Sequence, residues 1–201
     1  FEWVYFAGAD STLDRVSVYR SRLRLGEVLA QRVQQAIEDK KIEVDIVAPI
    51  PDTSRPATIA LAESLSLPYR EVFIKNRYVQ RSFILNTQEQ RERAVQLKLS
   101  PILSEIKGKN ILLVDDSIVR GTTSKTIVRL LRACGAKRIS IAVTCPPIRH
   151  PCYYGIDFPD PSVLVATDKD NAEISDWIGV DEVLYIDTDD LQEALSTTKL
   201  C

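Results

Sequence analysis

The sequence contains no methionine, a single histidine, and no apolar run long enough to cross a membrane. No signal peptide, internal repeat or low-complexity linker is visible in it. Its net charge of −2 gives no reason to expect a nucleic-acid partner. We therefore expect neither a membrane protein nor a nucleic-acid-binding protein.

Cysteine is also scarce. The four cysteines, at positions 134, 145, 152 and 201, do not have the spacing of a small disulfide scaffold. A reducing compartment fits them better, so we expect the protein in the cytoplasm. Because no initiator methionine is present and Phe1 lies inside an apolar run, we interpret the sequence as an excised portion of a longer protein.

No Gly-x4-Gly-Lys sequence occurs, which argues against a P-loop nucleotide-binding protein. What is present is an ordinary globular composition, with 45% apolar and 27% charged residues. The 201 residues are enough for one α/β domain with a substantial core.

Apolar runs and helix-type periodicities alternate along the chain, which predicts a mainly parallel sheet flanked by helices. The expected strands are residues 1–7, 44–50, 69–74, 111–114, 139–143, 163–166 and 183–186. The expected helices are one that starts near residue 18 and ends near residue 41, and others at 57–64, 122–134, 172–178 and 189–195.

The most informative stretch starts with the apolar run 111–114, which is typical of a strand covered on both faces. Asp115 and Asp116 follow at the carboxyl end of that strand, where open α/β sheets bind ligands. A loop, residues 117–121, then leads into a helix that begins with hydroxyl side chains and free N–H groups. Such a helix start suits a phosphate, so the stretch predicts one ligand with a phosphate plus hydroxyls or a metal.

Two other interpretations of this stretch stay open. One is a plain strand-to-helix turn with an N-cap. The other is a receiver domain of signalling type, in which an acidic pair holds magnesium beside a phosphorylated aspartate. A receiver has its acidic pair in the first strand, whereas here 110 residues precede it and Gly-Thr-Thr interrupts the helix.

Two further segments carry candidate chemistry. Residues 51–56, Pro-Asp-Thr-Ser-Arg-Pro, form a stiff loop after an expected strand, which could hold a second phosphate or its metal or be a common helix-start turn. Residues 75–98 contain six basic and two acidic side chains with Tyr78 and Phe83 interleaved. The basic residues from 91 on are typical of a solvated helix face. Those from 75 to 81 are better explained by contact with a ligand.

The stretch from 111 to 124 resembles the PRPP-binding motif of type I phosphoribosyltransferases, and closely that of the amidophosphoribosyltransferase family; PRPP is 5-phosphoribosyl 1-pyrophosphate. The resemblance extends to residues 146–157, which match the family's Pro-Pro-Ile-x-His-Pro-Cys-x-Tyr-Gly-Ile-Asp. It implies a type I phosphoribosyltransferase fold over 1–201, with a small hood from residues 1–25 and about 145–160. The family's N-terminal glutaminase domain has no counterpart in this sequence.

The resemblance implies an enzyme, a glycosyltransferase of the pentosyltransferase class. It would make 5-phosphoribosylamine and pyrophosphate from PRPP and glutamine-derived ammonia, the first step of purine biosynthesis. Residues 75–81 resemble the family's flexible catalytic loop, so Lys75, Arg77, Tyr78 and Arg81 are expected to be catalytic. The expected PRPP-binding residues are Asp52, Thr53, Ser54, Asp115, Asp116, Ser117, Ile118, Val119, Arg120, Gly121, Thr122 and Thr123. Magnesium would lie on Thr53, Ser54, Asp115 and Asp116.

Part of the family carries a 4Fe-4S cluster. Cys152 matches one of its ligands and Cys201 could be another, so we expect a partial ligand set here and a complete one in the longer parent. The resemblance also implies feedback inhibition by purine nucleotides and a homo-oligomer, a tetramer. The lone histidine, His150, is assigned no catalytic role.

Two other functions stay open. A phosphoribosyltransferase that salvages a purine or pyrimidine base would share Asp-Asp and Gly-Thr-Thr, but not residues 1–25 or 145–157. A non-catalytic PRPP-sensing regulator would keep the expected phosphate-binding turn, residues 117–123, which we call the phosphate cradle. It would lose the loop 75–81.

Overall fold

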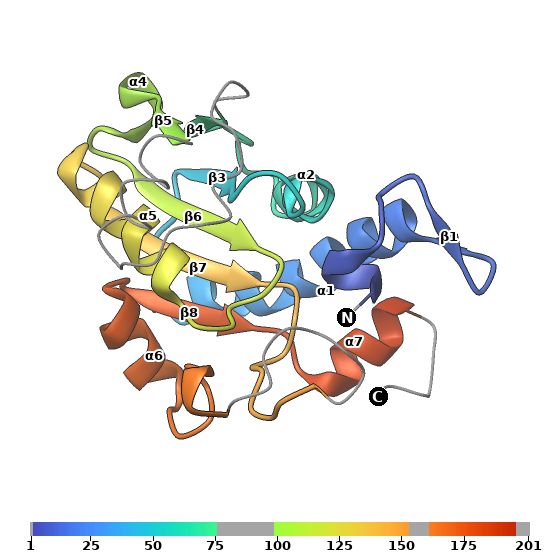
Figure 1. Ribbon diagram of the computed structural model, residues 1–201. Coiled ribbons are helices and arrows are strands. Elements are labelled where there is room, and N and C mark those ends of the chain that lie inside the picture. The colour runs from blue at the N-terminus through green and yellow to red at the C-terminus, as the bar shows by residue number, and fades with distance from the viewer. Residues whose placement is uncertain (1, 76–98, 153–160, 196–201) are drawn as a thin grey trace.

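The computed structural model describes residues 2–75, 99–152 and 161–195. Its centre is a parallel sheet in the order β3 (Ile46–Pro49), β6 (Asn110–Asp115), β7 (Arg138–Val143) and β8 (Glu182–Tyr185). Figure 1 shows the arrowheads of β6 and β7 pointing toward the N-terminal segment. The carboxyl edge of the sheet, where the site residues were predicted, therefore faces that segment.

The two middle strands are apolar on both faces because helices cover both sides of the sheet. In β6, the residues from Asn110 to Val114 are all buried, and β7 is buried after its first residue. Asp115 of β6 pairs with Val143 of β7, so the acidic pair lies at the end of the ladder. The predicted α/β class and the parallel sheet flanked by helices are confirmed.

Three helices pack together on one side. The long helix α1 (Val18–Glu38) contacts α2 (Arg55–Ser64) and α7 (Thr188–Leu195), and it lies behind the sheet in Figure 1. Ser17 caps α1 by accepting a hydrogen bond from the Arg20 N–H at 3.3 Å. On the other side, α5 (Thr122–Ala133) and α6 (Asn171–Ile178) contact each other, and α6 packs on β8.

Helices α1 and α2 approach unusually closely at Gly26. A Cβ atom built on Gly26 would lie 2.1 Å from the carbonyl oxygen of Ala57, in the first turn of α2. Only a residue without a side chain fits there, so Gly26 sets the distance between the two helices.

Several smaller elements lie outside the four-stranded sheet. Strands β1 (Thr12–Leu13) and β2 (Val16–Ser17) form a hairpin before α1. Strands β4 (Phe73–Lys75) and β5 (Leu99–Pro101) form a separate antiparallel pair, followed by the short helix α4 (Leu103–Ile106). Residues 76–98, which include part of the predicted catalytic loop, lie between β4 and β5 and outside the described residues.

Two strand predictions were wrong. Residues Glu2–Phe6 form a π-helix, η1, because no strand among the described residues pairs with them and Arg22 donates hydrogen bonds to the carbonyl groups of Trp3 and Tyr5 instead. The predicted strand 163–166 is a 3-10 turn, η2 (Pro161–Val163), followed by irregular backbone. There the Val165 N–H donates to the Val119 carbonyl, and the Ala166 carbonyl accepts from the Arg149 side chain. These backbone groups therefore bond to a loop and a side chain and not to a neighbouring strand.

The remaining predictions were correct in type and shifted at their ends. The strand expected at 69–74 pairs regularly only from Phe73, and Tyr69 makes a single bridge to Val47. Within the described parts of the chain, none of the helices has the length and apolar character needed to cross a membrane.

Candidate functional site

The acidic pair occupies a constrained corner at the end of β6. The Asp116 N–H donates to Asp115 Oδ1 at 2.9 Å, and the Ser117 hydroxyl donates to Asp116 Oδ1 at 2.9 Å. The Thr144 N–H donates to the Asp115 carbonyl at 3.1 Å, which ties the corner to the end of β7. Both carboxylates are thus fixed at the ligand-binding edge of the sheet.

Burial is the main cause of the raised pKa values of both carboxyl groups. It raises the pKa of Asp115 well above the usual value, and the neighbouring Asp116 carboxylate raises it further. Burial also raises the pKa of Asp116 to about 6, although the hydrogen bond from Ser117 and the charge of Arg22 oppose this. Two partly desolvated carboxylates that destabilise each other are stabilised by a bound cation. The pair therefore fits a magnesium ion, which needs few protein carboxylates when phosphate oxygens complete its coordination.

Arg22 was not predicted and is only 4% exposed. Its Nε donates to the Trp3 carbonyl at 3.0 Å, and one terminal nitrogen donates to the carbonyls of Tyr5, at 3.2 Å, and Ala7, at 2.8 Å. Arg22 thereby attaches the N-terminal segment to α1 and brings a positive charge near Asp116. One sequence signal was available, because position 22 falls on the apolar stripe of α1 between Val18 and Leu25.

The predicted phosphate cradle is a strand-to-helix turn that ends at Gly121. Gly121 has φ of 69°, and a Cβ atom there would lie 2.6 Å from the ring of Trp177. Thr122 and Thr123 are exposed at the start of α5, where the first N–H groups of a helix have no intrahelical partner. This arrangement can accept an anion.

Other members of the cradle have structural contacts. Ile118 is buried in the core, the Val119 carbonyl accepts from the Val165 N–H at 2.9 Å, and Arg120 is exposed. Their predicted contacts with PRPP stay predictions.

The second predicted loop, residues 51–56, opens α2. The Ser54 hydroxyl is buried and donates to the Ile50 carbonyl at 2.7 Å, so Thr53 is the loop hydroxyl that lines the adjacent cavity. Asp52 accepts from both Arg55 and Lys75. Burial raises the pKa of Asp52, but its ion pairs with Lys75 and Arg55 outweigh burial and hold that pKa below its usual value.

A cavity of about 400 Å³ lies between this loop and the N-terminal segment. Arg22 and Arg55 both line it, and neither was among the predicted site residues. Arg55 had a sequence signal, since it stands inside the loop that we had already singled out. The cavity is lined by Tyr5, Ala7, Gly8, Ala9, Arg22, Asp52, Thr53, Arg55 and Pro56.

Some predicted residues cannot be placed. Arg77, Tyr78, Arg81 and Cys201 lie outside the described residues. Lys75, at the end of β4, is placed, and its ion pair with Asp52 joins the predicted catalytic loop to the 51–56 loop.

The predicted iron site has no support in the described part of the chain. Cys152 is half-buried there, and no group of three or more His, Cys, Asp or Glu side chains in the described ranges is arranged to hold a metal. Cys145 is buried, and burial raises its pKa to about 12, which disfavours the thiolate that iron requires. These residues do not fit a 4Fe-4S cluster by themselves.

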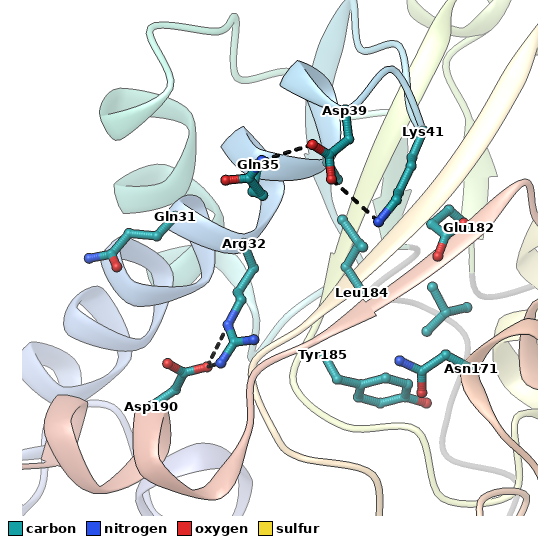
Figure 2. Close-up of a pocket in the computed structure, with 12 residues that line it drawn as sticks. Gln31, Arg32, Gln35, Asp39, Lys41, Asn171, Glu182, Leu184, Tyr185 and Asp190 are labelled. Atoms are coloured by element: carbon teal, nitrogen blue, oxygen red, sulfur yellow. Dashed lines mark hydrogen bonds and ion pairs between the residues drawn. The ribbon is translucent and has the colours of Figure 1, made fainter.

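A larger cavity, of about 570 Å³, runs along the outer strand β8 and α1 (Figure 2). Figure 2 shows Arg32 joined to Asp190 and Asp39 joined to Lys41, so these four charged side chains are paired with each other. None of the predicted site residues lines it. We therefore place the candidate site at the smaller cavity, which the predicted loop and Arg22 line, and at the acidic pair, whose Asp116 carboxylate lies near the charge of Arg22.

Comparison with known proteins finds relatives that match most or all of the chain. Residues 21–181 match the family described as phosphoribosyl transferase domain. The chain is 46% identical over 201 residues to the amidophosphoribosyltransferase of Methanocaldococcus jannaschii, covering 100% of the chain and 41% of that protein. It is 44% identical over 200 residues to the amidophosphoribosyltransferase of Saccharomyces cerevisiae, covering 100% of the chain and 39% of that protein.

A solved structure shows the same fold. Glutamine PRPP amidotransferase from B. subtilis, complexed with ADP and GMP, superimposes with a TM-score of 0.85 at 39% identity. The match covers 98% of the present chain and 42% of the B. subtilis chain. The chain thus spans about two fifths of the length of the relatives that it matches.

Proposed function

Because the chain belongs to the phosphoribosyl transferase domain family, we propose that its site binds PRPP and transfers the phosphoribosyl group to ammonia. The products would be 5-phosphoribosylamine and pyrophosphate, as in the first step of purine biosynthesis. The observation that carries the proposal is the acidic pair at the end of β6, next to a helix start that could accept a phosphate. Similarity to amidophosphoribosyltransferases over the whole chain supports ammonia as the acceptor.

Each part of PRPP has a counterpart in the site. The turn from Ser117 to Thr123 would hold the 5-phosphate at the start of α5. Asp115 and Asp116 would accept hydrogen bonds from the ribose hydroxyls or bind magnesium. Asp52, Thr53 and Ser54 belong to the loop that would face the pyrophosphate. The hood segments, about residues 1–25 and 145–160, would cover the ligand.

In the reaction, the bond between ribose C1 and the pyrophosphate oxygen breaks, and pyrophosphate leaves with the electron pair. The nitrogen of ammonia supplies its lone pair to C1 and then releases a proton. Since pyrophosphate is a good leaving group, the site has to position the reactants and stabilise charge. The predicted catalytic residues Lys75, Arg77, Tyr78 and Arg81 would exclude water and neutralise the leaving group.

Magnesium, when bound, would neutralise charge on the pyrophosphate. Asp115 and Asp116 offer carboxylates to it, and Thr53 offers a hydroxyl. Arg22 would keep Asp116 and the segment before α1 in place, since it donates to the Ala7 carbonyl of that segment and lies near that carboxylate.

We expect this chain to release pyrophosphate from PRPP when ammonia and magnesium are supplied. The measurement is pyrophosphate release with ammonia, compared with a panel of purine and pyrimidine bases, with and without EDTA. Release with a base and not with ammonia would favour a salvage phosphoribosyltransferase. Binding of PRPP without any release would favour a PRPP-sensing regulator.

Other features of the whole protein are proposals too. The ammonia would come from glutamine, through a glutaminase domain that these residues do not contain. The B. subtilis relative was solved with ADP and GMP, which supports purine nucleotides as feedback inhibitors. A tetramer in the cytoplasm is the assembly and location that we expect.

We also propose that a longer parent protein binds a 4Fe-4S cluster through Cys152, Cys201 and cysteines beyond this chain. Purified without oxygen, that parent should contain about four iron and four sulfide per chain, as this cluster type requires. A matched Cys152→Ser parent should lose both, whereas Cys134→Ser should keep them. Fully active parent protein without iron would contradict the proposal.

A further inference from the structure

The cavity beside the 51–56 loop has an internal charge arrangement that the proposed reaction does not explain. Arg55 donates to Asp52 Oδ1 at 2.7 Å, and the Lys75 ammonium donates to Asp52 Oδ2. One carboxylate thus bridges two cations, one from α2 and one from β4. All three side chains are between one third and one half exposed, so the solvent and a ligand can reach them.

Arg55 has a second, independent anchor. Its Nε donates to Glu71 Oε1 at 2.9 Å, and the Tyr69 hydroxyl donates to the same oxygen at 2.6 Å. If Asp52 moved away, Glu71 would still hold the guanidinium at the rim of the cavity. Arg55 can therefore exchange one anionic partner while it keeps its position.

We propose that Asp52 is an internal counter-ion of the site, and that the pyrophosphate group of the ligand displaces it and takes over Arg55 and Lys75. The inference rests on the proposed function, because PRPP is what would bring a pyrophosphate group to this loop. It makes Arg55 a specificity-determining residue for ligands that carry a pyrophosphate.

Three physical considerations support the exchange. Half-exposed ion pairs such as those of Asp52 contribute little net stability, so breaking them is easy. Pyrophosphate has several negative charges and can accept paired hydrogen bonds from a guanidinium, which a single carboxylate shared with a lysine cannot match. The start of α2 also favours an anion, since Ser54 makes no side-chain cap and its hydroxyl donates to Ile50 instead.

Binding of inorganic pyrophosphate tests this directly. We would titrate the chain with pyrophosphate by isothermal calorimetry in EDTA at low salt, so that no metal bridges the anions. Asp52→Asn should bind about tenfold more tightly than the wild type, because the internal competitor is gone. Arg55→Gln should bind about tenfold more weakly, because one cation of the pair is lost.

The matched control is Glu43→Gln. Glu43 forms exposed ion pairs with Lys137 and Arg138 and lies before β3, at the opposite end of that strand from the 51–56 loop. The substitution changes the net charge by the same amount as Asp52→Asn, and it should alter pyrophosphate affinity by less than about twofold.

Unchanged or weaker binding by Asp52→Asn would overturn the proposal, and so would an equal gain in Glu43→Gln. If Asp52→Asn does not fold, Asp52→Ser carries the same expectation. The two proposals can fail separately. Suppose that Asp52→Asn binds pyrophosphate more tightly but the wild type releases no pyrophosphate from PRPP. This result would contradict the proposed reaction and support the proposal that Asp52 is an internal counter-ion.

Discussion

The double substitution Asp115→Asn and Asp116→Asn should abolish pyrophosphate release from PRPP while the protein stays folded. Each charged contact that is lost should cost about 1.5–3 kcal/mol. Together they correspond to a rate reduced by a factor of about 10²–10⁴. The measurement is initial pyrophosphate release at saturating magnesium, with circular dichroism as the check on folding. A folded double variant that keeps its activity would refute the site assignment.

Substitution in the same pair should raise the stability of the folded protein, although it lowers activity. The pKa of Asp116 in the folded protein is about 6, above its usual value, so the folded state binds more protons than the unfolded state between about pH 4 and 6. Stability therefore falls as the pH rises through this window. Asp116→Asn removes that loss and should raise the free energy of unfolding at pH 8 by on the order of 2 kcal/mol. Urea unfolding at pH 5 and pH 8 measures the difference.

Gly26→Ala should destabilise the protein strongly, although alanine is the better helix former. In an exposed helix the exchange would gain about 1 kcal/mol. Here the new methyl group would lie 2.1 Å from the Ala57 carbonyl oxygen, and a backbone atom in a helix cannot move aside cheaply. Overpacking of this kind costs about 1–3 kcal/mol or more, so the contact outweighs the propensity.

We expect a net loss of about 2 kcal/mol and a fall in Tm of about 4–8 °C for a chain of this length. The measurement is thermal unfolding followed by circular dichroism. Glu27→Ala, the exposed neighbour on α1, is the matched control and should change Tm little. A Gly26→Ala protein that is as stable as the wild type would mean that α1 and α2 can move apart freely.

The sequence was sufficient where one short segment determines its own structure. The run before Asp115 has no polar alternation, and only a strand covered on both faces suits it, so the acidic corner could be placed in advance. Gly121 and the hydroxyls after it likewise predicted the helix start. In these places local propensity and tertiary structure agree.

Other features depend on distant partners and could not be predicted. Residues 2–6 are rich in aromatics, as strands are, but Arg22 in a different element satisfies their carbonyl groups and favours a helical turn. A nearer partner matters as well, since the Ser54 hydroxyl donates to the carbonyl of Ile50, just before the loop, while the predicted contact of Ser54 with PRPP stays a prediction. The pairing of Asp52 with Lys75 joins residues far apart in the sequence.

The separate pair of strands β4 and β5 has a consequence for evolution. Lys75 at the end of β4 and Leu99 at the start of β5 are direct partners in that pair, while the four-stranded sheet forms without them. Because the ends are already held together, lengthening the intervening segment adds only about 0.6 kcal/mol of closure entropy per doubling. Insertions and deletions after the predicted catalytic residue Arg81 and before β5 can therefore accumulate in a lineage without disturbing the core that carries Asp115 and Asp116.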